Sequence, residues 1–125
     1  MNNLIIDAAN NKILFKIISL DKSYTSDYPN SRENFDKFLI FLTNFLNKNN
    51  IEIKDLDNIF INQGPGKFSG IRISMSIVKA FSVTNKLNLY GFNSHHVVGY
   101  NYNNIIDLFN KGKLIKNLIK PLYSS

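Results

Sequence analysis

The chain has 125 residues, a length typical of one domain, and its composition of 44% hydrophobic and 19% charged residues excludes a disordered tail. The absence of cysteine excludes disulfides and thiolate metal sites, and no apolar run approaches the ~18 residues of a membrane span. The formal charge of +6 is uneven, because residues 58–125 carry eight Lys or Arg and one acid, Asp107. We expect a cytoplasmic globular domain without a membrane partner.

The first expected elements are two short strands. Residues 4–6 and 12–20 are apolar, and Asn10-Asn11 between them favours the tight turn of a β-hairpin. Residues 21–30 are polar and contain Pro29, which predicts a loop or an irregular third strand.

A helix and a strand follow the hairpin. From Phe35 to Leu46 the apolar residues recur at spacings of three and four, as on one face of a helix that begins near Ser31. Residues 59–61 then form a compact apolar strand. This alternation is typical of an α/β fold.

The second half of the chain continues the alternation. Residues 70–85 are helical in pattern, residues 87–92 form another strand, and residues 94–100 begin a third helix. The last segment is basic and amphipathic, with Gly112 as a helix terminator and Pro121 enforcing an extended end.

A glycine-rich turn joins the strand at 59–61 to the following helix. It contains Gly64, Pro65, Gly66 and Gly70, which demand unusual backbone angles and leave amides beside a helix N-terminus. Such a turn can hold a phosphate, or it can be only a tight strand-to-helix connection. Its spacing matches neither a Walker loop nor a dinucleotide fingerprint.

The helix after this turn carries two apolar stripes. At 100° per residue, Ile71, Met75 and Val78 lie on one side, whereas Ile73, Ile77, Ala80 and Phe81 lie nearly opposite. A chain of this size has little material to cover a second face. One stripe is therefore expected to pack on the sheet and the other to meet a partner, and the spacing does not say which.

The turn and its helix carry a family resemblance. Gly64, Pro65, Gly66, Phe68, Ser69, Gly70 and Arg72 resemble the Gly-Pro-Gly-x-Phe-Thr/Ser-Gly-x-Arg motif of the TsaB (YeaZ) family, the dimerisation subunit in bacterial synthesis of threonylcarbamoyladenosine in tRNA. The similarity runs from residue 3 to about 100. It implies a single actin-like (ribonuclease H-like, ASKHA) α/β domain with a mixed sheet and flanking helices.

The resemblance also implies a function and partners. TsaB-like proteins do not transfer the group themselves but support the catalytic subunit TsaD, so no catalytic residue and no metal ligand is expected here. The interface residues implied on the helix are Phe68, Ser69 (also a helix cap), Ile71, Arg72, Ile73, Ser74, Ile77 and Phe81. ATP and a metal are expected on TsaD rather than on this chain. The ATPase subunit TsaE would be reached through the complex, and a homodimer is expected in isolation.

The sequence departs from the family in two places. Relatives carry a second domain, so residues 1–102 are interpreted as the TsaB-type domain and residues 103–125 as a basic tail remaining from a shortened second domain. Asp7 stands where actin-like proteins hold phosphate and metal, but Ala8-Ala9 follow it without donors. We therefore interpret Asp7 as a turn cap and only secondarily as a phosphate-site candidate.

The remaining points are a pair of adjacent histidines and two alternative functions. His95-His96 are adjacent, so they cannot chelate a metal as an i, i+4 pair on a helix does. An actin-like ATP-dependent phosphotransferase is an alternative function that would require nucleotide binding. A small basic tRNA-binding module is another, resting on the charge of residues 58–125, whereas the TsaB interpretation expects indirect or weak tRNA contact.

Overall fold

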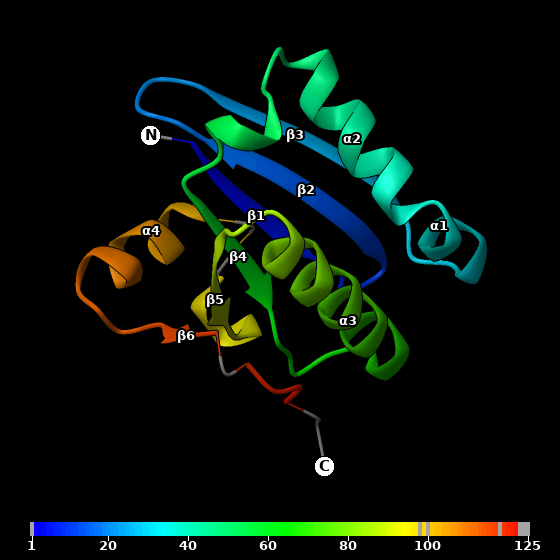
Figure 1. Ribbon diagram of the computed structural model, residues 1–125. Helices are drawn as coiled ribbons and strands as arrows, with labels where there is room; N and C mark the ends of the chain where they lie inside the picture. Colours follow the sequence, from blue (N-terminus) through cyan, green and yellow to red (C-terminus); the bar gives the residue numbers. More distant parts are fainter. Residues whose placement is uncertain (1, 98, 100, 118, 123–125) are drawn as a thin grey trace.

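Figure 1 shows the computed structural model, which describes residues 2–97, 99, 101–117 and 119–122. In this part of the chain a six-stranded mixed sheet has the order β3-β2-β1-β4-β5-β6. The strands β1, β4 and β5 are parallel, and the other pairings are antiparallel. The strands are β1 (Asn3–Asp7), β2 (Lys12–Ile18), β3 (Ser23–Pro29), β4 (Asn58–Asn62), β5 (Asn88–Phe92) and β6 (Ile115–Lys116).

Helices cover both faces of the sheet, as Figure 1 shows. The helices α1 (Arg32–Asp36), α2 (Phe38–Lys48) and α3 (Phe68–Thr84) lie on one face, and α4 (Asn103–Asn110) lies on the other. Every residue of β1 and β4 is buried, because these central strands have a core on each side. The predicted α/β class with a mixed sheet and flanking helices is confirmed. Among the described residues, no helix has the length and apolarity needed to cross a membrane.

Two expected elements differ in the structure, and one that was left open is decided. Lys37 separates α1 from α2 within the single helix predicted there, a break that an apolar periodicity of three and four cannot reveal. Of the loop and the irregular strand predicted for residues 21–30, the structure has the strand, because Ser23–Pro29 pair with β2 over the whole length of β3. In place of the third helix at 94–100, the structure has one 3-10 turn, Ser94–His96, and α4 begins only at Asn103. Residues 98 and 100 lie outside the described residues.

The segment interpreted as a tail packs on the sheet. Ile105 of α4 is buried in the second core, and β6 pairs with β5 as an additional edge strand. Ile119 is buried against the first core, and the Leu122 amide donates to the Gln63 carbonyl at 2.6 Å. The division at residue 102 concerns ancestry and stays a prediction, and residues 123–125 lie outside the described residues.

Candidate functional site

The turn after β4 is bound to the β1–β2 hairpin. The Asn62 side-chain oxygen accepts a hydrogen bond from the Gly64 amide at 2.8 Å, and the Gly64-Pro65 peptide is cis. Three residues later, the Lys67 amide donates to the Ala9 carbonyl at 2.7 Å. These bonds fix the path of the chain between the sheet and α3.

The glycines of this turn serve close packing. A Cβ at Gly66 would collide with the Ala9 carbonyl, and one at Gly70 would collide with the Ala8 carbonyl. Gly64 lies against the Leu122 carbonyl and also has a φ of 106°, which L side chains rarely adopt. These contacts favour the tight-turn interpretation of the motif over a phosphate-binding one.

The start of α3 differs from the expected one. The helix begins at Phe68, its N-cap is Lys67, and no side chain caps it. Ser69, which we expected to cap the helix, lies exposed in its first turn, so this prediction is wrong. The reason is the bond from the Lys67 amide to Ala9, which holds the chain in position for the helix to start earlier.

The structure decides which stripe of α3 faces outward. Ile71, Met75 and Val78 are buried against the sheet, whereas Ile73 is 37% exposed on the opposite side. Ser74 is also buried and donates its hydroxyl to the Ile71 carbonyl at 3.1 Å. Ile71 and Ser74 were assigned to the partner surface, and this assignment is corrected, because both side chains contact only the interior of this chain.

The outward face of α3 carries a shallow groove of about 340 Å³, which we name the α3 groove. At its start Phe68 is 53% exposed, and the Arg72 guanidinium lies 5.2 Å from the centroid of the Phe68 ring. Ile77 is half-buried and, like Phe81, packs partly against the first core. The α3 groove is lined by Phe68, Ser69, Arg72, Ile73, Ser76 and Ile77.

Asp7 at the end of β1 has hydrogen-bond donors on both carboxylate oxygens. One oxygen accepts from the Ala9 amide at 3.1 Å and from the Asn62 side chain at 3.0 Å, and the other accepts from the Tyr102 hydroxyl at 2.7 Å. Asp7 thus caps the hairpin turn. The three bonds within the chain, together with the absence of a polar side chain at Ala8, favour the turn-cap interpretation of Asp7 over a phosphate site. Sequence reasoning missed Tyr102, since no local pattern relates it to Asp7.

The two histidines lie on the 3-10 turn after β5. His95 is exposed, whereas the His96 Nδ1 accepts a hydrogen bond from the Asn93 amide at 3.1 Å. Burial, and secondarily the charge of His95, lowers the pKa of His96 below its ordinary value of 6.5. Across the described residues, no group of three or more His, Cys, Asp or Glu side chains is placed to hold a metal.

More than half of the chain matches a known protein family. The family model described as TsaD, tRNA N6-adenosine threonylcarbamoyltransferase, matches residues 30–107, more than half of the chain. The chain belongs to the TsaD family. The match includes α1 to α3, β4, β5 and most of α4, so it covers the turn and the α3 groove.

Two curated relatives illustrate the similarity of this TsaD-family chain. The tRNA threonylcarbamoyladenosine biosynthesis protein TsaB of Buchnera aphidicola subsp. Schizaphis graminum is 35% identical over 63 residues, covering 50% of this chain and 30% of that protein. The tRNA N6-adenosine threonylcarbamoyltransferase of Fervidobacterium nodosum is 25% identical over 96 residues, covering 75% of this chain and 28% of that protein. The chain thus spans about a third or less of these relatives, and the predicted resemblance to TsaB is confirmed.

Solved structures agree on the fold. YeaZ from Pseudomonas aeruginosa superposes with a TM-score of 0.67 at 16% identity, covering 74% of this chain and 43% of that one. A second structure, described as an uncharacterized protein with similarity to peptidase YeaZ from the same organism, has a TM-score of 0.68 at 16% identity and the same coverage. At this identity the likeness concerns the fold, and the predicted actin-like fold of the TsaD-family chain is confirmed.

Proposed function

We propose that this chain is a non-catalytic subunit that binds a TsaD-type catalytic subunit and supports it in threonylcarbamoylation of the tRNA adenosine beside the anticodon. The observation that best supports this proposal is the α3 groove, in which the apolar side chains of Phe68 and Ile73 are exposed to solvent. Family membership and the similarity to TsaB support the choice of partner and pathway.

The chemistry of the α3 groove suits a helix of a partner. Exposed apolar side chains at Phe68 and Ile73 alternate with the small residues Ser69 and Ser76, which allow a second backbone to approach closely. The 17 residues of α3 extend over about 25 Å at 1.5 Å per residue, enough for several turns of a facing helix. Arg72 at the groove can bond a carboxylate of the partner.

In this proposal, ATP and a metal belong to the catalytic partner and not to this chain. The Asp7 carboxylate supports this assignment, because it already accepts three hydrogen bonds within the chain at the position that a phosphotransferase would need for its nucleotide. The α3 groove would serve a homodimer when the partner is absent, and TsaE would be reached only through the complex. Detectable ATP binding by the isolated chain would instead favour the phosphotransferase alternative.

The test is co-purification with the TsaD-type subunit of the same cell. Ile73→Asp and Phe68→Asp place a carboxylate in the α3 groove, whereas Leu20→Asp changes an apolar side chain that is 93% exposed in the β2–β3 turn. Ile77 and Phe81 are unsuitable positions, because they also contact the core. We expect both groove variants to lose the complex while folding normally, and Leu20→Asp to keep it. A complex that survives both groove substitutions would rule out this surface.

A further inference from the structure

A cluster of lysines lies on the segment that follows α4. Lys111, Lys113, Lys116 and Lys120 fall within ten residues and are all exposed. Lys116 lies in β6, one of the two edge strands of the sheet, and the other three lysines flank it in the sequence. We name these four residues the basic edge.

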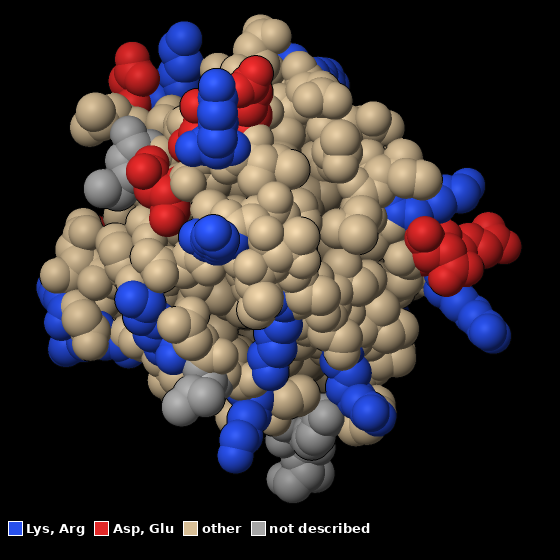
Figure 2. Space-filling view, viewed as in Figure 1, with Lys and Arg blue, Asp and Glu red and all other residues tan. Residues whose placement is uncertain are grey.

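The positive charge of the basic edge has little compensation. Asp107 is the only acid after residue 57 in the sequence. The ion pairs found among the described residues, Lys12–Asp27 and Lys54–Glu52, both lie in the first half of the chain. In Figure 2, the lowest part of the visible face shows Lys and Arg without Asp or Glu, and the same holds at the left where Figure 1 places β6. A mobile polyanion could therefore approach without repulsion.

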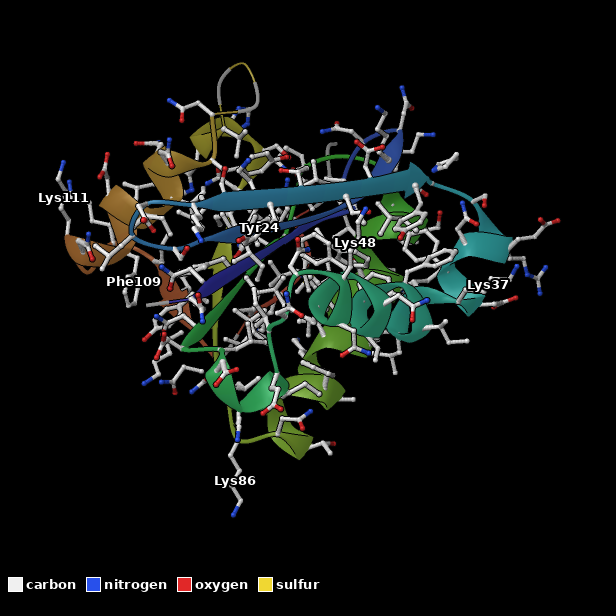
Figure 3. All side chains as sticks on the ribbon, turned by 90° about the horizontal axis from the view of Figure 1, so that it is seen from above. Tyr24, Lys37, Lys48, Lys86, Phe109 and Lys111 are labelled. Atoms are coloured by element: carbon white, nitrogen blue, oxygen red, sulfur yellow. The ribbon has the colours of Figure 1, made fainter. Side chains whose placement is uncertain are left out.

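Part of the basic edge packs on aromatic rings. The Lys116 Nζ lies 5.9 Å from the centroid of the Tyr90 ring, which contacts Phe109 at 4.9 Å and Phe60 at 5.6 Å between ring centroids. Lys111 extends outward from the end of α4, next to Phe109 (Figure 3). The aromatic cluster thus anchors the strand that carries Lys116 and the helix end that carries Lys111.

We propose that the basic edge binds the phosphate backbone of an RNA. Only the identity of that RNA, the tRNA that the catalytic partner modifies, rests on the proposed function. The basic edge lies at the margin of the sheet, whereas α3 covers one of its faces, so both surfaces can be occupied together (Figure 1).

An anionic membrane fits this surface less well. Membrane-surface segments need a continuous apolar face beside their basic residues. Within the described part of residues 111–122, the large apolar side chains that stand exposed are Ile115 and Leu122, seven positions apart. The two-residue strand β6 cannot present a continuous apolar stripe.

The experiment measures tRNA binding by the whole chain at several salt concentrations, using an unmodified, fluorescently labelled tRNA transcript. One variant changes Lys111, Lys113, Lys116 and Lys120 to Gln. The matched control changes Lys12, Lys22, Lys48 and Lys54 to Gln, removing the same charge from exposed positions in the first half. We expect the basic-edge variant to bind about 10²- to 10³-fold more weakly at 0.1 M salt, with a log–log salt slope smaller by about three. The control should keep the wild-type slope.

Several results would overturn the proposal. An equal loss in both variants would mean that only net charge matters, and an unchanged affinity of the basic-edge variant would place binding elsewhere. Tighter binding to anionic phosphatidylserine vesicles than to tRNA would favour a membrane. The basic-edge variant should still co-purify with the TsaD-type subunit. Salt-dependent tRNA binding without any such complex would support the basic edge and reject the proposed function.

Discussion

The Tyr102 hydroxyl donates a hydrogen bond of 2.7 Å to the Asp7 carboxylate, although the two residues lie 95 positions apart in the chain. Tyr102 is the N-cap residue of α4, and Asp7 is the last residue of β1. The bond therefore ties a helix of the second core to the central strand. It also occupies the carboxylate that an actin-like nucleotide binder would direct toward phosphate and metal.

Removing this hydroxyl should destabilise the fold. Tyr102→Phe leaves one buried oxygen of Asp7 without that donor, and an unmade bond to a buried charged group costs about 1–3 kcal/mol. Chemical denaturation measures the loss in the free energy of unfolding. Tyr24→Phe, on the edge strand β3, is the control and should change it by less than about 0.5 kcal/mol. Equal effects of the two substitutions would contradict the assigned role of Tyr102.

The turn motif gives a steric prediction. Gly66→Ala should destabilise the protein by about 1–3 kcal/mol, because the new Cβ would collide with the Ala9 carbonyl. Gly112→Ala has open space around it, so only its positive φ of 69° opposes the change, at a cost of about 1 kcal/mol. Thermal or urea unfolding of both variants measures the difference. If Gly112→Ala were the more damaging one, close approach to Ala9 would not explain the motif.

The C-terminal segment should contribute to stability. Ile119 is fully buried against the first core, so Ile119→Ala should cost about 2–4 kcal/mol through lost burial and the cavity left behind. Leu122→Ala removes an exposed side chain of the same segment and is the matched control. Urea denaturation of both variants provides the measurement. Similar stabilities of wild type and Ile119→Ala would show that the segment is not part of the folded unit.

His96 should make stability depend on pH. Its folded-state pKa lies below 6.5, mainly through burial and also through His95, so the unfolded chain binds more protons between the two pKa values. The contribution of His96 to the free energy of unfolding should therefore decrease as pH falls through the window below 6.5 and stay constant above it. Protonation also removes the acceptor that Nδ1 offers to the Asn93 amide.

NMR titration of the imidazole signals measures this pKa directly. His95→Gln is the informative variant, because it removes the neighbouring charge and should raise the pKa of His96 while leaving its burial intact. A wild-type pKa at or above 6.5 would contradict the prediction.

Local patterns predicted most of the fold. The buried strands and α3 were recognised because apolar periodicity reports which residues face a core. The apolar spacing did not predict the break at Lys37, because one residue outside the helix leaves that spacing almost unchanged. The strand β6 was not predicted either, because its two residues are exposed and show no periodic pattern of apolar residues. The strand β3 remained ambiguous with a loop, because its side chains are polar and lie at the edge of the sheet.

By itself, the sequence determined the α/β order, the strand–turn–helix around Gly64 and the presence of two apolar stripes on α3, because each depends on residues close together in the chain. Only the tertiary structure decided that the stripe with Ile73 faces outward and that the Tyr102 hydroxyl donates a hydrogen bond to the Asp7 carboxylate. It also decided that the motif glycines lie against the β1–β2 hairpin and Leu122. These relationships join segments distant in sequence. They follow from the path of the chain through the sheet, which local propensity does not encode.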